Sequence, residues 1–204
     1  MAKQIEGVYE KVLECAKVEF LKKGFKDASL RTIAQNAKTS TGSIYTRFSD
    51  KKGLFNAIVV PVVENLKQWF WLSQENFHKL PNNIQKEEAF NYSKEKMENF
   101  VDYIYDNFDI FTLLISCSEG TEYSMFIHDL VEIEIEYTIK FIKAIESDAL
   151  LSERITPELM HMLSSSFYTG IFEIVVHKMT RENAHKYVNQ LKRFFEVGWK
   201  DIFK

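Results

Sequence analysis

The stretch from Thr41 to Lys51 gathers side chains that donate hydrogen bonds to phosphate groups and to the edges of DNA bases. Hydroxyl, tyrosine, arginine and lysine side chains contact phosphates, and the first residues of a recognition helix lie against base edges. Two members have a plainer explanation, because the ring of Tyr45 could pack in a core and Lys51 could be an ordinary solvated lysine. We predict a DNA contact surface made of Thr41, Gly42, Ser43, Tyr45, Thr46, Arg47 and Lys51.

Two short helices joined by a tight turn would hold this surface in place. Ser29 is a good N-cap for a helix over 30–37, and Ser40 can cap a second helix over 41–48. The turn between them is residues 38–40. This is the arrangement of a helix-turn-helix, which presents its second helix to the major groove. A small apolar core must fix the angle between the helices, and it is supplied by Leu30, Ile33, Ala34, Ile44 and Phe48.

The rest of the chain also reads as helical, so we predict an all-α fold. Apolar residues recur at helical spacing, and the 204 residues include only 3 prolines and 7 glycines. Gly24 ends a first helix. Beyond residue 50, further helices are expected over 51–78, 84–119 with a possible break near 107–109, 122–149, 157–179 and from Thr180 to the C-terminus.

One segment argues for a strand. Residues 131–137 alternate strictly between apolar and acidic side chains, as a half-buried strand would. No second strand-like run lies nearby, and a lone strand cannot satisfy its backbone hydrogen bonds. We therefore favour a helix here as well.

An ordered set of residues runs through the first 60 positions. Its members are Phe20, Gly24, Phe25, Leu30, Arg31, Ile33, Ala34, Ala37, Ser40, Gly42, Ser43, Ile44, Tyr45, Phe48, Lys51, Gly53, Leu54 and Phe55. This set resembles the TetR family of bacterial transcriptional regulators. The resemblance implies a three-helix DNA-binding domain over 1–50, and a helical domain for ligand binding and dimerisation over 51–204.

Carried over by position, the resemblance gives roles to the contact residues. It places Thr41 and Gly42 near bases, and Arg31 within reach of the groove or backbone. Its phosphate contacts are Ser43, Tyr45, Arg47 and Lys51.

Two positions depart from the pattern of the family. The turn often contains Gly where this chain has Lys38, and a left-handed conformation is harder for Lys than for Gly. A His is common where this chain has Arg47, which keeps its charge near neutral pH. The turn could therefore differ slightly, while phosphate affinity is kept.

Charge and composition agree with a DNA-binding module on a separate body. Residues 1–60 carry 11 Lys and Arg against 6 Asp and Glu, whereas residues 61–204 carry 15 against 23. A basic surface attracts phosphates and an acidic one aids solubility, although chance asymmetry is the alternative. The opening residues are charged, and no apolar stretch is judged long enough for a membrane span. With Cys15 and Cys117 expected as core residues rather than a disulfide, we expect a cytoplasmic protein.

The acidic part is expected to bind an unknown small-molecule effector, with no other cofactor and no metal. Aromatic residues at helical spacing are usually core, but some could line a cavity. Glu134 falls in the middle of an apolar arc, where a carboxylate needs a partner. That partner could be a cationic ligand, a buried Lys or Arg, or a second subunit. The expected ligand-binding residues are Tyr103, Phe111, Phe126, Glu134, Tyr168 and Phe172.

The last two helices are apolar on two sides, which favours burial against both the body and a second copy of the chain. The alternative is that both stripes serve one monomer core. The expected dimer-interface residues are Phe167, Ile171, Ile174, Leu191, Phe194, Phe195, Gly198 and Ile202.

Catalysis is not expected. The chain lacks a Gly-rich phosphate loop and the HExxH, GxSxG and CxxC motifs. Glu173 and His177 are spaced i,i+4 and could bind a metal, but such a pair is more often a solvated salt bridge. The favoured interpretation is a ligand-responsive regulator, most simply a repressor, that binds palindromic double-stranded DNA as a homodimer and does not bind membranes. The alternative is a helical adaptor that acts through protein contacts without sequence-specific DNA binding.

Overall fold

The all-α prediction is confirmed by a computed structural model, which describes residues 2–204 and their side chains from Gly7 onward. No strand occurs in these residues. The chain divides into two compact units. We call residues 2–65 with 107–124 the head, and residues 66–106 with 125–204 the body.

The head is built around a cluster of aromatic side chains. Phe20 and Phe55 are fully buried, with ring centroids 5.2 Å apart, and Phe25 stacks on Phe20 and meets Phe55 edge-on. α1 is interrupted at Gly24, whose φ of 73° is open to glycine at little cost. The helices of the head are α1 (Ala2–Asp27), α2 (Leu30–Asn36), α3 (Thr41–Phe48), the first part of α4 (Lys51–His78) and α6 (Phe108–Ser116).

The link from α3 to α4 brings the backbone of the two helices close together at Gly53. Ser49 has a φ of 67°, and the Asp50 carboxylate accepts a hydrogen bond from the Gly53 N–H at 2.7 Å. A Cβ on Gly53 would lie 1.9 Å from the carbonyl oxygen of Phe48. Only glycine therefore allows α4 to begin so close to the end of α3.

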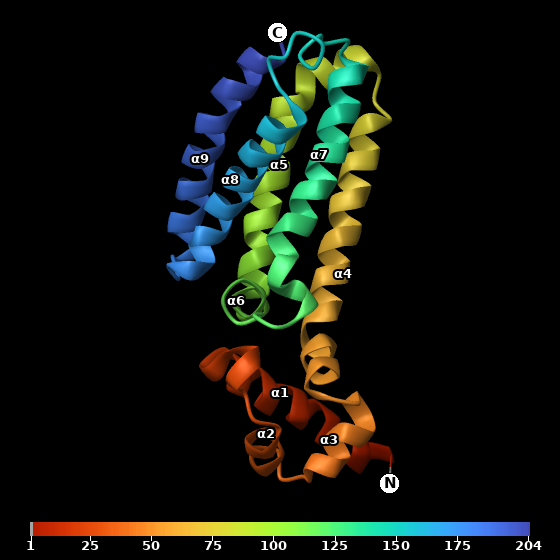
Figure 1. Cartoon of the computed structure of the whole chain (residues 1–204), viewed down its shortest axis with the longest axis vertical. Coiled ribbons are helices and arrows are strands. Elements are labelled where there is room, and N and C mark those ends of the chain that lie inside the picture. The colour runs from red at the N-terminus through yellow and green to blue at the C-terminus, as the bar shows by residue number, and fades with distance from the viewer. Residues whose placement is uncertain (1) are drawn as a thin grey trace. The chain divides into compact units, whose positions relative to one another are not determined.

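The body is a bundle in which α7 packs on α8, α8 on α9, α9 on α5, and α5 on α7. Arg181, at the start of α9, donates to Asp102 and Asp106 of α5 at 2.9 Å each. Figure 1 shows these helices running alongside one another together with the second part of α4. The remaining elements are α5 (Asn82–Asp106), the short 3₁₀ helix η1 (Glu122–Met125), α7 (Phe126–Ala144), α8 (Pro157–Val176) and α9 (Arg181–Ile202).

Most helix limits agree with the sequence prediction. The break expected near residues 107–109 lies at Asn107, and the segment 131–137 is helical within α7. The helix expected over 122–149 is shorter, because α7 ends at Ala144 and Glu146 follows with a φ of 54°. Since α4 contributes to both units and residues 107–124 join the head, packing does not follow a single linear boundary. The functional boundary at residue 50 stays a prediction.

α8 corrects the expectation that no apolar stretch is long enough for a membrane span. By length and composition alone, its 20 residues could cross a membrane. A core helix passes the same test, and α8 packs against both α7 and α9. Its buried residues include Tyr168 and Phe172, so α8 acts as a core helix of the body.

Candidate nucleic-acid interface and ligand cavity

Side-chain caps hold the two short helices of the head as predicted. The hydroxyl oxygen of Ser29 accepts from the Thr32 N–H at 3.3 Å, and that of Ser40 accepts from the Ser43 N–H at 3.1 Å. Lys38 in the turn has a φ of 55°, so lysine occupies the left-handed conformation that glycine adopts more easily. The sequence did not reveal the buried Glu19, whose carboxylate accepts from the Ser29 N–H at 3.2 Å.

α3 presents one buried and one accessible face. Ile44 and Phe48 are buried, while Tyr45 is 53% exposed. Thr46 is exposed, but its hydroxyl donates to the Gly42 carbonyl at 2.9 Å and is engaged within the helix. The other predicted contact residues of α2 and α3 are exposed or half-buried, and they are Arg31, Thr41, Gly42, Ser43 and Arg47.

Lys51 has a structural role that the sequence did not reveal. Its ammonium donates to the carbonyl oxygens of Lys26 at 2.9 Å and Ala28 at 3.1 Å. It also lies 4.9 Å from the centre of the Phe25 ring. The side chain therefore ties the start of α4 to the end of α1. Because an ammonium has three N–H donors, one is left for a phosphate.

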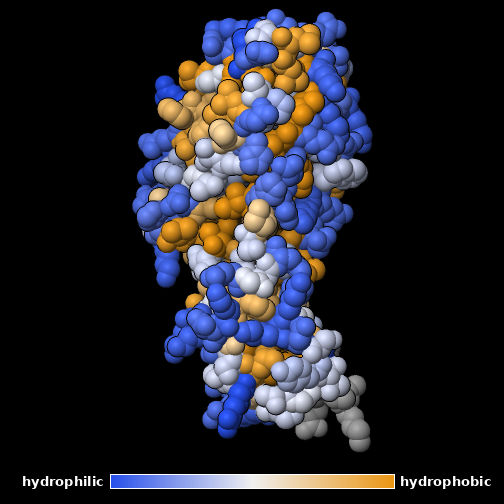
Figure 2. All heavy atoms as spheres, in the orientation of Figure 1, coloured by the Kyte–Doolittle hydropathy of each residue, from blue (hydrophilic) through white to orange (hydrophobic). Residues whose placement is uncertain are grey.

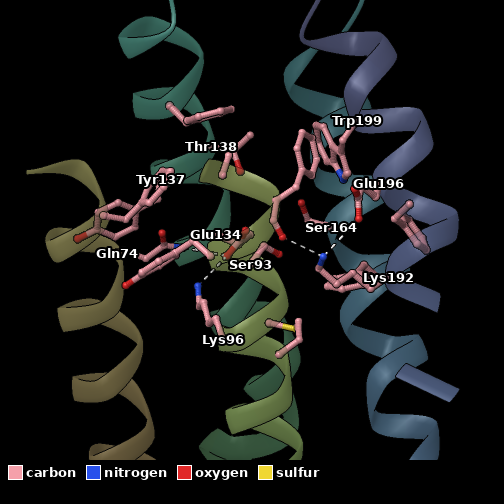
Figure 3. A pocket seen from close by; sticks show the side chains of 18 of the residues that line it. Gln74, Ser93, Lys96, Glu134, Tyr137, Thr138, Ser164, Lys192, Glu196 and Trp199 are labelled. Carbon is pink, nitrogen blue, oxygen red and sulfur yellow. Dashed lines mark hydrogen bonds and ion pairs between the residues drawn. The ribbon is translucent and has the colours of Figure 1, made fainter. Parts of the chain in front are cut away.

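The body contains a cavity of about 160 Å³, partly open to solvent, between α4, α5, α7, α8 and α9 (Figure 3). About half of its lining residues are aromatic. Polar side chains reach it in two groups, which Figure 3 shows on either side of the cavity. The first comprises Gln74, Lys96, Glu134 and Tyr168, and the second Lys192 and Glu196.

Glu134 is the centre of the first group. Its Oε2 atom accepts from the Gln74 amide and the Tyr168 hydroxyl, both at 3.1 Å, and lies 3.7 Å from the ammonium of Lys96. Lys96 is only 8% exposed, and its ammonium also lies 3.7 Å from the centre of the Phe70 ring. Glu134 therefore both lines the cavity and pairs with a buried lysine.

Burial dominates the electrostatics of this group. It lowers the pKa of Lys96, which the carboxylate of Glu134 opposes. It raises the pKa of Tyr168 well above its usual value, and here the charge of Glu134 adds to the effect. Tyr168 thus stays protonated and donates its hydroxyl hydrogen.

The second group comes from α9. The ammonium of Lys192 donates to the carbonyl oxygen of Phe90 at 3.1 Å and to Glu196 at 3.3 Å. Lys200 binds the other oxygen of Glu196 at 2.6 Å. The hydrogen bond from Lys200, helped by Lys192, holds the pKa of Glu196 below its usual value.

His78 and Tyr137 close the side of the cavity near α4. Their rings stack with centroids 5.4 Å apart, and Gln85 hydrogen-bonds the His78 ring at 3.1 Å. Burial lowers the pKa of His78. Burial and a 2.8 Å hydrogen bond to Glu75 raise the pKa of Tyr137 to about 12.

Two of the six residues expected to bind a ligand line the cavity, and they are Glu134 and Tyr168. Phe126 and Phe172 instead pack on each other in the core at 5.7 Å. Phe111 is buried in the head, and half-buried Tyr103 of α5 is not part of the lining. Helical periodicity marks these four as apolar without showing which side faces an opening.

Comparison with known proteins finds relatives of the head. Residues 12–58 match the family described as bacterial regulatory proteins, tetR family. The head is therefore similar to the DNA-binding part of that family. A 66-residue stretch is 39% identical to the uncharacterized HTH-type transcriptional regulator YvdT of Bacillus subtilis, and this match spans 32% of each chain.

Two solved structures share the fold of most of the chain. NalD of Pseudomonas aeruginosa, described as the secondary repressor of the MexAB-OprM multidrug efflux pump, superposes with a TM-score of 0.55. It is 18% identical over 93% of this chain and 96% of NalD. A transcriptional regulator from Aquifex aeolicus gives a TM-score of 0.52 at 19% identity, covering 93% of this chain and 98% of that protein. At these identities the likeness establishes the fold, and these relatives are regulators rather than enzymes.

The residues predicted for a dimer face lie in different environments. Ile171 and Ile174 are fully buried within one subunit, where they serve its own core. Phe167 and Phe195 pack edge-to-face, with ring centroids 5.2 Å apart, and line the cavity. The periodicity of α8 showed two apolar stripes but not which one its own subunit covers.

Four expected interface residues lie elsewhere on α9. Leu191 is half-buried and would meet any Cβ at Gly170 at 2.9 Å. Ile202 packs against the small core around Ile142 and Met160. Phe194 and Gly198 remain exposed.

Proposed function

We propose that this protein is a ligand-responsive transcriptional repressor that binds a palindromic operator as a homodimer and acts in the cytoplasm, where its DNA lies. The observation that carries the proposal is the accessible face of α3, held by two side-chain caps in a TetR-type head. A capped recognition helix with an exposed tyrosine and neighbouring basic groups suits backbone contacts, and its first residues suit contacts with bases.

The cavity supports the effector part of the proposal. A volume of about 160 Å³ is close to that of a cavity that holds benzene, whereas drug-sized ligands occupy roughly 300–1,000 Å³. A larger effector would fill the cavity and either extend through its opening or widen it by displacing the helices around it. α4 is one of them, since it supplies Gln74 to the cavity and Lys51 to the head. The effector acts as a switch only if it binds the DNA-incompetent state more tightly.

The lining suggests a mainly apolar, aromatic effector with one or two polar groups. The two polar groups of the cavity are each built on a lysine–glutamate pair, so they add little net charge. Glu134 uses Oε2 for its three partners. Its other oxygen is therefore the natural acceptor for a donor on the effector.

Exposed apolar residues on α8 and α9 support self-association. Phe194 is 76%, Val197 68% and Met162 64% exposed. In the view of Figure 2, hydrophobic residues reach the surface of the body as patches among hydrophilic ones. Two copies that cover such residues would form a bundle of four helices with a twofold axis, which matches a palindromic operator.

Selection from a randomised duplex DNA pool across a salt series tests the proposal. We expect enrichment of a palindrome and a steep fall of affinity with salt, because phosphate contacts release counterions. Tyr45→Phe should weaken binding to every sequence alike, whereas Thr41→Ala should change which sequences are enriched. Absence of enrichment, with association to proteins that does not depend on salt, would favour the adaptor function instead.

A further inference from the structure

Three metal-ligating side chains converge on the surface of the body, away from the cavity lining. His128 and Glu132 lie one turn apart on α7, and His161 faces them from α8. Nε2 of His161 lies 3.4 Å from Nδ1 of His128 and 3.6 Å from Oε1 of Glu132. All three ligand atoms lie within 4.8 Å of one another.

These separations are those of a tetrahedral metal site. With metal–ligand bonds of about 2.0–2.1 Å, the edges of a coordination tetrahedron measure about 3.4 Å. The two separations from His161 match that edge. Closing the third needs only a rotation of exposed side chains, because His128 and Glu132 are both solvent-accessible. Two rigid helices therefore present the ligands at nearly the required spacing.

We infer that His128, Glu132 and His161 form a binding site for a divalent transition-metal ion, of which zinc fits best. Two imidazoles and one carboxylate suit zinc, copper, nickel or iron better than magnesium or calcium, which prefer oxygen ligands. Three protein ligands leave a fourth tetrahedral position for water or another ligand. The hydroxyl of Ser165 lies 3.5 Å from Nδ1 of His161, where it can orient the ring.

The bound ion would clamp α7 to α8. Both helices also supply the cavity, with Glu134 two residues beyond Glu132 and Ser164 one turn beyond His161. The metal therefore stabilises the helix pair that holds the Glu134 group. This inference does not depend on DNA binding by the head.

The chain contains a matched control for a simple His–Glu pair. Glu173, in the last turn of α8, and His177, its C-cap, are also spaced i,i+4, and their Oε2 and Nε2 atoms lie 3.0 Å apart. They are not part of the three-ligand cluster. If zinc bound any surface His–Glu pair equally well, His177→Ala would weaken zinc binding as much as His161→Ala does.

The test is titration of zinc chloride into metal-stripped, tag-free protein, followed by calorimetry. We expect one ion per chain. His161→Ala and His128→Ala should weaken binding at least about tenfold, and Glu132→Gln about tenfold, whereas His177→Ala should stay within about twofold. Thermal unfolding should shift upward by roughly 5 °C when free zinc exceeds its Kd about a hundredfold.

Cobalt adds a readout of geometry, because tetrahedral cobalt(II) absorbs visible light far more strongly than octahedral cobalt(II). The intense spectrum should appear with the wild-type chain and disappear in His161→Ala. The metal-free variants should unfold at the wild-type temperature, since their side chains are accessible. Zinc binding that is absent, or that survives both histidine substitutions, would overturn the assignment.

Discussion

The head and the body place their polar groups in opposite ways. In the head, the core is made of Phe20, Phe25 and Phe55, and the residues proposed to contact DNA face outward from α3. In the body, Lys96 and Glu134 point inward and meet beside a cavity. Binding and folding should therefore be largely separable in the head, where of the proposed contact residues Lys51 also ties the start of α4 to the end of α1. In the body they are joined, because the groups offered to an effector are also polar partners within the fold.

The largest effect is expected where the head does not tolerate change. Gly53→Ala should lower the free energy of unfolding by about 3 kcal/mol, because the new Cβ would overlap the carbonyl oxygen of Phe48 and force α3 and α4 apart. Urea denaturation measures this. Gly7→Ala is the matched control, since no atom lies near its Cβ in α1, and it should be neutral or stabilising by up to about 1 kcal/mol. Equal effects of the two would contradict the close approach.

The buried pair of the body gives the next largest effect. Glu134→Ala should cost about 2 kcal/mol, because Lys96 would lose its carboxylate while still buried. Lys96→Met should stay within about 1 kcal/mol of the wild type, since it removes the buried charge itself. In the Lys96→Met background, Glu134→Ala should cost clearly less. A double-mutant cycle by denaturant unfolding checks this coupling, and purely additive effects would show that the pair is not coupled.

Lys51 and Tyr45 test how far binding and folding separate in the head. Lys51→Met should destabilise by about 1 kcal/mol, because the carbonyl oxygens of Lys26 and Ala28 lose their donor. Tyr45→Phe should change stability by less than about 0.5 kcal/mol, since the side chain is exposed. Both should weaken DNA binding without changing sequence preference, as measured by fluorescence anisotropy on two duplexes. A marked loss of stability in Tyr45→Phe would show that binding and folding are joined in the head as they are in the body.

The smallest effect is a pH dependence in the body. Burial lowers the pKa of His78, so the unfolded chain takes up its proton first as the pH falls below the ordinary value of 6.5. The unfolded state then binds more protons than the folded one, and stability falls with the pH through this window. Thermal unfolding measured at several pH values should show that the unfolding temperature of His78→Gln falls less steeply with decreasing pH than that of the wild type. Identical slopes for both proteins would remove His78 as the cause.

The sequence was most informative where local rules decide the structure. The caps at Ser29 and Ser40, the helix break at Gly24 and the break at Asn107 all follow from local chemistry, and each lies where it was predicted. Glu134 was found because a carboxylate on an apolar arc conflicts with its surroundings.

The rest depended on long-range packing. Lys96 looked like one of many lysines, because nothing near it in the sequence shows that α7 will bring Glu134 within 3.7 Å. Ile171 and Phe194 have similar apolar character, yet one is buried within the subunit and the other is exposed. The His128 and His161 cluster was missed for the same reason, since its members come from two helices.

The division of labour within α3 has an evolutionary consequence. Two of its eight residues, Ile44 and Phe48, are buried and hold the helix, while its N-cap Ser40 lies just outside it. The positions proposed to read DNA are thus free of most structural duties. After gene duplication, a few substitutions at these positions would give each copy its own operator without eroding the stability of the head. The same feature makes α3 the natural place to graft a new DNA specificity onto this chain while keeping its sensing body.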